Sequence, residues 1–192
     1  MSGTAHPELG AIAIGQGRAP ADVIARAANI RLVIFDVDGV LTDGRLFFDE
    51  SGREYKSFHA RDGHGIKLLR STGVEAAVIS GRRTPSVTRR MESLGVELIF
   101  QGIEDKLDTF SAICRKMRLT ADQVAHVGDD LLDLPVMRRV GLSVAVADAN
   151  PLILPFAHWT TRCVGGMGAA REVCDLVMAA QGTLAAIVEG YL

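Results

Sequence analysis

The chain has 192 residues, of which 48% are hydrophobic, as expected for a folded protein with a sizeable core. Its 21 basic and 23 acidic residues leave a formal net charge of −2, which argues against nucleic acid or an anionic membrane as the main partner. No apolar run approaches the roughly 20 residues of a membrane-spanning helix, so we expect no membrane partner.

The N-terminal part differs in composition from the rest of the chain. Residues 1–18 are rich in glycine, alanine and polar residues, and we expect a flexible arm there. They lack the basic start of a secretory signal, so we expect no such signal. Pro20 suits the first turn of a short helix that reaches Ala28. We therefore divide the chain into an arm with a short helix at 1–28 and one domain at 29–192.

Strands and helices alternate through this domain. RLVIF at 31–35 is apolar at nearly every position, as in a strand that is covered on both faces, and 45–58 has the pattern of a hairpin with a turn near Ser51–Gly52. Later strands are expected at 75–80, 96–102, 123–128, 142–147 and 158–162. Helices are expected at 62–72, from Pro85 to Gly95, at 105–118, 130–140 and 151–157, and from 168 to about 188. This alternation predicts a doubly wound, three-layer, Rossmann-like α/β fold with a hairpin insertion.

The three cysteines bear on the cellular compartment. Cys114, Cys163 and Cys174 are odd in number and form no C-x-x-C pair. Such spacing favours reduced thiols over a metal site or a disulfide framework. We therefore expect a cytoplasmic protein.

Polar residues that suit chemistry follow four of the expected strands. The strand ends and the residues just beyond them are Asp36-Val37-Asp38-Gly39, Ser80-Gly81-Arg82, Lys106, and Gly128-Asp129-Asp130 with Asp133 one turn later. In doubly wound folds, ligands bind at the carboxyl ends of the strands. We therefore expect these side chains to converge on one crevice.

The spacing of Asp36 and Asp38 points to phosphoryl transfer. Two carboxylates so close at the end of a buried strand repel each other, unless a cation or a shared proton compensates. Mg²⁺ selects carboxylate oxygens, and with Lys106 it would offset the charge on a transferring phosphoryl group. One carboxylate can then attack phosphorus, while the second protonates the leaving alcohol and later activates water. Ser80 would donate a hydrogen bond to the phosphoryl group.

The motifs DVDGVLTDG (36–44), SGR (80–82), Lys106 and GDDLLD (128–133) resemble those of the haloacid dehalogenase superfamily of phosphatases. The resemblance implies specific roles. Asp36 would be the nucleophile, Asp38 the general acid and base, and Ser80 and Lys106 the phosphoryl clamps. Asp129 would bind Mg²⁺ together with the Asp36 carboxylate and the Asp38 carbonyl, supported by Asp130 and Asp133. Thr42 and Gly81, inside the motifs, are candidate substrate contacts.

A narrower resemblance covers most of the chain. It is to the 3-deoxy-D-manno-octulosonate 8-phosphate (Kdo 8-phosphate) phosphatases of lipopolysaccharide synthesis. The stretches that carry it include DGVLTDG, RDGHGI (61–66), FQG (100–102), VGDDLLDLPVM (127–137), GLSVAVADANP (141–151) and GAAREVCDLV (168–177). The resemblance implies a Mg²⁺-dependent homotetramer with almost no cap domain, in which neighbouring subunits help to cover each active site.

The sequence supports an uncapped site independently. Only one hairpin and one helix separate the first two motifs, which is too little for a lid domain. An open phosphoryl site needs some other means of excluding water. The hairpin aromatic residues Phe47, Phe48, Tyr55 and Phe58 could pack against other subunits; the alternative is a hairpin folded on its own domain.

The choice of sugar phosphate depends on fewer residues. A sister family, which acts on a nine-carbon sialic-acid-like sugar phosphate, typically has Glu where this chain has Arg82. Arg82 could pair with the carboxylate of Kdo, and Arg61 and Arg90 are further candidates for this contact. One departure concerns the tail, where the family usually has arginine and this chain has Met167.

Two hypotheses from other classes stay open. A receiver-type signalling domain shares the sheet, the Mg²⁺, an aspartate, a Ser/Thr and a lysine. Receivers are shorter and have no acid two residues after the phosphorylated aspartate, so Asp38 is the discriminating residue. The other hypothesis is a non-catalytic domain that has kept the fold, and the intact motifs argue against it.

Overall fold

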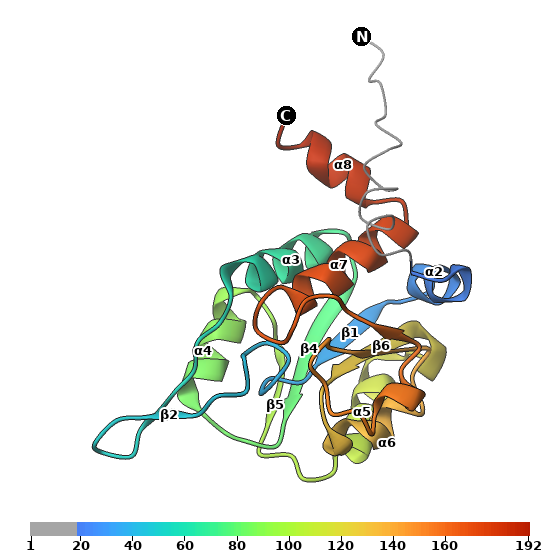
Figure 1. Cartoon of the computed structure of the whole chain (residues 1–192). Coiled ribbons are helices and arrows are strands. Elements are labelled where there is room, and N and C mark those ends of the chain that lie inside the picture. Colours follow the sequence, from blue (N-terminus) through green and yellow to red (C-terminus); the bar gives the residue numbers. More distant parts are fainter. Residues whose placement is uncertain (1–18) are drawn as a thin grey trace.

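The computed structural model describes residues 19–192, shown in Figure 1. The arm expected at 1–18 lies outside these described residues. The short helix expected after Pro20 is confirmed, since α2 covers Ala21–Ala28 with Pro20 at its N-cap. In the described part of the chain, no helix has both the length and the apolar character needed to cross a membrane.

A six-stranded sheet forms the centre of the molecule. Its strands in spatial order are β5 (Leu98–Gln101), β4 (Glu75–Ser80), β1 (Leu32–Phe35), β6 (Val124–Gly128), β7 (Leu142–Ala145) and β8 (Trp159–Thr160). Every neighbouring pair is parallel. The chain runs outward from β1 through β4 to β5, and then returns to β6 on the other side of β1. The expected doubly wound sheet is confirmed, and its topology reverses between β1 and β6.

Strand β1 contributes side chains to the hydrophobic clusters on both faces of the sheet. All four of its residues are buried. Val33 and Phe35 belong to one hydrophobic cluster, and Leu32 and Ile34 belong to another on the opposite face. Because successive side chains of a strand point to opposite faces, a strand that is apolar at every position supplies both cores.

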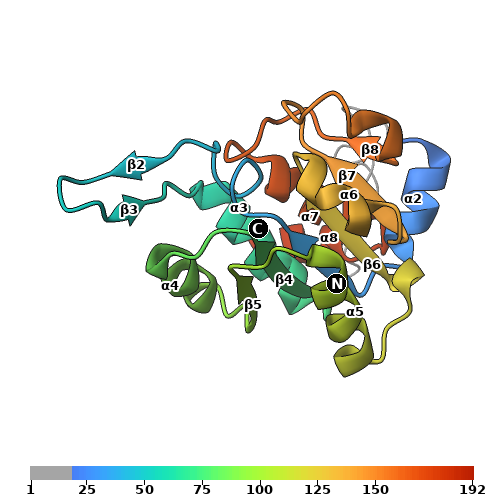
Figure 2. The same cartoon turned by 90° about the horizontal axis from the view of Figure 1, so that it is seen from below.

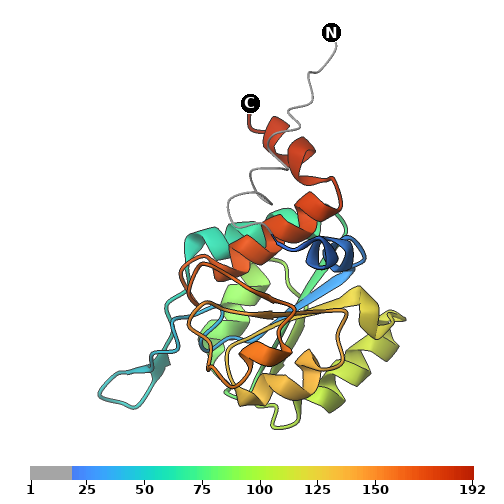
Figure 3. The same cartoon turned by 45° about the vertical axis from the view of Figure 1, so that its right-hand side comes forward.

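Helices cover both faces of the sheet and complete the three layers. On one face lie α2, α3 (Ala60–Ser71), α4 (Pro85–Ser93) and α7 (Ala169–Ala180), whose buried residues share a cluster with Phe35. On the other face lie α5 (Lys106–Met117) and α6 (Leu134–Met137). Figure 3 shows the blue, teal and red helices together on one side of the sheet. A last helix, α8 (Leu184–Glu189), extends beyond α7.

Two expected helices are shorter than predicted. In place of a helix at 130–140, a 3₁₀ turn at Leu131–Asp133 leads into the single-turn helix α6. The tightening follows from Asp133, whose carboxylate accepts hydrogen bonds from the backbone N–H groups of Asp129 and Asp130. Instead of a helix at 151–157, the structure has a 3₁₀ turn at Leu154–Phe156. A further 3₁₀ turn, Ala121–Gln123, lies directly before β6.

The expected hairpin is present and projects from the body of the protein (Figures 1 and 2). It consists of β2 (Phe47–Phe48) and β3 (Glu54–Tyr55), paired antiparallel. Phe47, Phe48 and Tyr55 are 47%, 56% and 49% exposed, whereas Phe58 at the base packs against the core. The alternative of a hairpin folded on its own domain is therefore wrong for the projecting part.

Candidate active site

The loops that follow β1, β4, β5 and β6 meet at one end of the sheet and enclose a pocket of about 170 Å³. The pocket is lined by Asp36, Asp38, Ser80, Gly81, Arg82, Lys106, Asp129, Asp130, Leu132 and Asp133. The structure therefore brings together residues from all four strand ends. They lie near the point where the sheet topology reverses, which is where such folds bind ligands.

The loop after β1 depends on glycine at two places. Gly39 has a φ of +94°, which L side chains rarely adopt, and a Cβ there would lie 2.1 Å from Asp129 Oδ2. A Cβ at Gly165 would lie 1.7 Å from the Gly39 carbonyl oxygen. The first motif is thus pressed between Asp129 and the loop before α7. Thr42 fixes the turn, since its buried hydroxyl donates to the Val37 carbonyl at 3.2 Å.

A buried lysine joins two of the carboxylates. Lys106 begins α5, and its side chain is only 3% exposed. Its Nζ donates to Asp36 Oδ1 at 2.5 Å and to Asp133 Oδ1 at 2.7 Å. A buried ammonium is stable only when carboxylates and hydrogen bonds compensate its desolvation. Lys106 thus binds one of the two carboxylate oxygens of Asp36 and fixes the orientation of that side chain.

Asp133 is the centre of a second set of contacts. Its Oδ1 also accepts a hydrogen bond from His126 Nε2 at 2.9 Å, and its Oδ2 accepts from the backbone N–H groups of Asp129 and Asp130 at 3.0 and 3.3 Å. Burial alone would raise the pKa of Asp133, but the His126 hydrogen bond and the Lys106 charge hold that pKa below its usual value. Asp133 is therefore a carboxylate fixed in orientation by four donors.

The pKa values of Asp36 and Asp129 are raised, whereas that of Asp133 is lowered. Burial raises the pKa of Asp36 to about 7 despite the nearby charge of Lys106, and the Asp133 charge adds to this rise. Burial, with the charges of Asp36 and Asp133, raises the pKa of Asp129 to about 8. Lys106 is shared between Asp36 and Asp133, so its single positive charge is not enough to keep Asp36 and Asp129 ionised as well.

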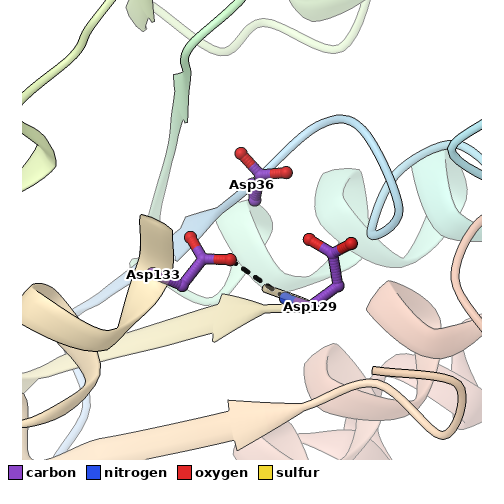
Figure 4. A group of neighbouring side chains, drawn as sticks. All are labelled: Asp36, Asp129 and Asp133. Carbon is purple, nitrogen blue, oxygen red and sulfur yellow. Dashed lines mark hydrogen bonds between the residues drawn. The ribbon is translucent and has the colours of Figure 1, made fainter. Parts of the chain in front are cut away.

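These three carboxyl groups fit a divalent cation. One oxygen from each of Asp36, Asp129 and Asp133 lies within 4.8 Å of the others (Figure 4). All donors are carboxylate oxygens, the ligands that Mg²⁺ prefers. A cation here would add to the charge of Lys106 the further positive charge that Asp36 and Asp129 need to ionise.

Asp38 lines the same pocket and has different partners from the other carboxylates. Its Oδ1 pairs with Lys56, at the base of the hairpin, and its Oδ2 accepts a hydrogen bond from Ser80 Oγ at 3.4 Å. Lys56 Nζ also lies 2.7 Å from Glu54 Oε1, and Glu54 Oε2 is 2.8 Å from Arg82 Nη2. The hairpin thus contributes charged side chains to the edge of the pocket.

The three candidate arginines are placed differently. Arg82 lines the pocket, with 44% of its side chain exposed. Arg61 is exposed near the start of α3, and Arg90 on α4 lines a separate small cavity with Asp62 and Gly63. Met167, in the loop before α7, is 53% exposed. Of these three arginines, Arg82 is the one that lines the candidate pocket within a single chain.

Sequence reasoning missed Glu54, Lys56 and His126. Glu54 and Lys56 lie two residues apart along an extended segment, so they point to the same side, but the local pattern does not tell which side faces the site. His126 did carry a signal, because it is a polar residue inside an otherwise apolar strand. It is fully buried, and among the described residues its Nδ1 has no hydrogen-bond partner.

A larger cleft of about 880 Å³ lies elsewhere, between α4 and β5. It is lined by Arg83, Thr84, Pro85, Thr88, Arg89, Glu92, Ile99, Phe100, Gln101 and Ile103. Glu92 is the one acidic residue in this lining, which holds no carboxylate pair and no buried lysine. The smaller pocket at the strand ends is the better candidate for catalysis, since it combines carboxyl groups of shifted pKa with a buried ammonium.

Known proteins resemble this chain in both sequence and fold. A haloacid dehalogenase-like hydrolase family model matches residues 97–172. The 3-deoxy-D-manno-octulosonate 8-phosphate phosphatase KdsC of Escherichia coli (strain K12) is 51% identical over 168 residues, which cover 88% of this chain and 89% of that protein.

Two solved structures extend this likeness. The phosphatase of the same name from Yersinia pestis superposes with a TM-score of 0.84 at 51% identity, covering 85% of this chain and 89% of that chain. The enzyme from Moraxella catarrhalis, solved in complex with a magnesium ion, a phosphate ion and a KDO molecule, has a TM-score of 0.89 at 34% identity, covering 90% of this chain and 99% of that chain. The chain belongs to the 3-deoxy-D-manno-octulosonate 8-phosphate phosphatase family of haloacid dehalogenase-like hydrolases.

Proposed function

We propose that this protein hydrolyses Kdo 8-phosphate to Kdo and inorganic phosphate through an aspartyl-phosphate intermediate, as a step of lipopolysaccharide precursor synthesis. The family and the Kdo-bound relative from Moraxella catarrhalis support the substrate. The observation that carries the chemistry is the pocket itself, in which Asp36 is held by the buried Lys106 beside Asp129 and Asp133.

Asp36 is the nucleophile of this mechanism. Lys106 binds Oδ1, which leaves Oδ2 to attack phosphorus. The bond between Asp36 and phosphorus forms as the bond from phosphorus to the sugar oxygen breaks, and the carboxyl proton of Asp38 passes to that oxygen. Ser80 and the Lys106 ammonium donate hydrogen bonds to the phosphoryl oxygens, whose charge they stabilise.

The second step releases phosphate. Asp38, now a carboxylate, takes a proton from a water molecule as its oxygen bonds to phosphorus. The bond from phosphorus to Asp36 breaks, which restores the Asp36 carboxylate and leaves inorganic phosphate. A receiver domain lacks a residue in the position of Asp38, so its phosphoryl group persists. Here Asp38 makes the phosphoryl group transient.

Asp36, Asp129 and the Asp38 carbonyl would hold Mg²⁺, with Asp133 beside them. When bound, the ion offsets negative charge between the carboxylates and the phosphoryl oxygens. The fit rests on the raised pKa values of Asp36 and Asp129, since both carboxyl groups need a positive partner to ionise.

Arg82 is the substrate-binding residue that the pocket supports best. It adjoins the pocket and would pair with the carboxylate of Kdo by charge-assisted hydrogen bonds, after exchanging its present partner Glu54. Gly81 and Thr42 would shape the phosphoryl end. The second candidate substrate is the related nine-carbon sugar phosphate, which also carries a carboxylate.

The pocket is too small to enclose the whole substrate. Ligand sites usually have roughly 300–1,000 Å³, so the sugar would extend beyond the 170 Å³ between the strand ends. We propose that the protein is a cytoplasmic homotetramer in which neighbouring subunits complete each site. Arg61 and Arg90 would then act near the interface, and the exposed aromatic residues of the hairpin support assembly. In this proposal, residues 29–192 form one catalytic domain, and α2 packs onto it through Val23 and Ala27.

Phosphate release from a panel of sugar phosphates tests this proposal. The panel contains Kdo 8-phosphate, the nine-carbon sugar acid phosphate and glucose 6-phosphate, each with Mg²⁺ and with EDTA. We expect the highest kcat/KM for Kdo 8-phosphate and no turnover in EDTA. A higher value for the nine-carbon substrate would replace the substrate assignment. Turnover that persists after chelation would contradict the metal-dependent mechanism.

A further inference from the structure

One charged residue at the edge of the pocket, Lys56, has no part in the proposed steps although it pairs with Asp38. Lys56 lies just after β3, at the base of a hairpin that projects into solvent (Figure 2), yet its side chain is only 1% exposed. Its ammonium pairs with Asp38 Oδ1 and with Glu54 Oε1. A lysine side chain is almost never buried unless charged partners compensate the desolvation of its ammonium, so the burial of Lys56 depends on Asp38 and Glu54.

Asp38 has few other contacts to hold it. It lies in the loop beyond β1, and its side chain is 19% exposed. Its second oxygen accepts only the long hydrogen bond from Ser80 Oγ, at 3.4 Å. Lys56 is therefore the stronger of the two contacts that orient this carboxylate. Asp36, by comparison, is fixed by Lys106 from inside the fold.

We propose that Lys56 is a positioning residue, which holds Asp38 where its proton can reach the leaving oxygen of the substrate. The inference rests on the proposed role of Asp38. As the bond from phosphorus to the sugar oxygen breaks, the proton moves from Asp38 to that oxygen, and Asp38 becomes a carboxylate. The hydrogen bond from Lys56 to Oδ1 holds the carboxyl group in the same orientation before and after the proton leaves.

Glu54 connects this pair to the substrate-binding side of the pocket. It accepts a hydrogen bond from Arg82 Nη2 at 2.8 Å and pairs with Lys56 through its other oxygen. The row Asp38, Lys56, Glu54, Arg82 therefore alternates in charge. The base of the hairpin places a proton donor and a carboxylate-binding arginine relative to each other.

A comparison of leaving groups tests the inference. The alcohol of a sugar phosphate leaves poorly without a proton, whereas p-nitrophenol leaves readily as an anion. The parameter kcat/KM reports only the steps up to the breaking of the phosphorus–oxygen bond. Lys56→Met keeps the length of the side chain and removes its charge. We expect kcat/KM for Kdo 8-phosphate to fall at least about tenfold, and that for p-nitrophenyl phosphate to fall less than about twofold.

Three further variants complete the experiment. Lys56→Arg keeps the charge and should recover most of the activity on Kdo 8-phosphate. Lys67→Met removes an exposed lysine of α3 and should leave kcat/KM for both substrates unchanged. Asp38→Asn should show the same dependence on leaving group as Lys56→Met, with larger losses. If Lys56→Met does not fold, as judged by circular dichroism, Lys56→Gln takes its place under the same criteria.

The outcomes separate this inference from the proposed function. If Lys56→Met lowers kcat/KM equally for both substrates, or for neither, the proposed role of Lys56 is wrong. The proposed mechanism still stands in that case if the loss of kcat/KM in Asp38→Asn depends on the leaving group. If Asp38→Asn showed no such dependence, both the role of Asp38 and that of Lys56 would fail. A selective loss on Kdo 8-phosphate that Lys56→Arg restores is the result expected.

Discussion

Two sets of side chains face the pocket, and the fold holds them differently. The sheet set comprises Asp36, Lys106, Asp129 and Asp133, which lie just beyond strand ends or in the elements that follow, and His126, in the middle of β6. The hairpin set comprises Glu54 and Lys56, together with Arg82, which pairs with Glu54. Most of the sheet set is buried, and its contacts are formed within the core. The hairpin set joins the body to a segment whose own aromatic residues face solvent.

The two sets have different parts in the proposed reaction. In the proposed mechanism the sheet set would surround the phosphoryl group, where attack and charge stabilisation tolerate little displacement of atoms. The hairpin set would lie on the side of the leaving alcohol and the sugar. A rigid phosphoryl site joined to a more exposed substrate side would let specificity vary without disturbing the proposed catalytic aspartates.

The largest effect should come from the sheet set. Lys106→Met removes the ammonium between Asp36 and Asp133, so two buried carboxylates lose their shared partner. We expect kcat to fall at least about a hundredfold and the metal-free protein to lose about 3 kcal/mol of unfolding free energy. Steady-state kinetics and urea unfolding in EDTA measure the two effects. Unchanged stability would show that Lys106 does not compensate the charges of the buried carboxylates.

Proton competition at the metal cluster should be the next largest effect. The pKa values of Asp36 and Asp129 are raised to about 7 and 8, so Mg²⁺ must displace protons as pH falls below 8. We expect Mg²⁺ affinity, measured by titration calorimetry, to be at least about tenfold weaker at pH 6 than at pH 8.

The same pKa shifts predict how stability depends on pH. The folded metal-free protein binds more protons at these two carboxyl groups than the unfolded chain does. Its unfolding free energy should therefore fall as pH rises from about 4 to about 8, and Mg²⁺ should stabilise it more at pH 8 than at pH 6. Equal Mg²⁺ affinity at the two pH values would contradict the assignment of Asp36 and Asp129 to the metal.

Arg82 tests the hairpin set on the substrate side. Its guanidinium is partly exposed, so we expect Arg82→Ala to raise KM for Kdo 8-phosphate about tenfold. Because the contact is with the sugar carboxylate, kcat/KM for glucose 6-phosphate, which has no carboxylate, should change little. Comparable losses on both substrates would place Arg82 at the phosphoryl group instead.

The smallest effect on rate should come from the projecting part of the hairpin. Phe48→Ser removes an exposed aromatic side chain that supports the proposed tetramer, and Leu152→Ser, at a similarly exposed leucine, is the control. We expect Phe48→Ser to shift the mass measured by light scattering toward smaller species and to lower kcat/KM about threefold, because the site would be less shielded from water. A tetramer unchanged in mass would remove the hairpin from the interface.

The sheet set, apart from His126, could be predicted from the sequence because of the topology of the fold. Parallel strands end at the same edge, so the order of strands along the chain is enough to place Asp36, Ser80, Lys106 and Asp129 together. The exact course of the chain after β6 could not be predicted. A helix was expected from 130, and the tertiary contacts of Asp133 tighten this segment into a 3₁₀ turn instead.

The contacts of the hairpin set could not be predicted from the local sequence pattern. The turn near Ser51–Gly52 and the two arms were predicted correctly. The direction in which a hairpin leaves the body depends on contacts remote in sequence, such as that of Lys56 with Asp38 across 18 residues. In the sequence, Lys56 resembles any surface lysine, and only the fold places it beside a catalytic candidate.

Trapping the covalent intermediate tests the central claim most directly. The enzyme is mixed with Kdo 8-phosphate, quenched in acid and treated with borohydride, which reduces an aspartyl phosphate to homoserine. Trypsin then releases residues 32–45 as one peptide for mass spectrometry. The account predicts homoserine at position 36 in the native enzyme and none in Asp36→Asn, which should also release no phosphate. Homoserine at position 38, or phosphate release by Asp36→Asn at the native rate, would contradict it.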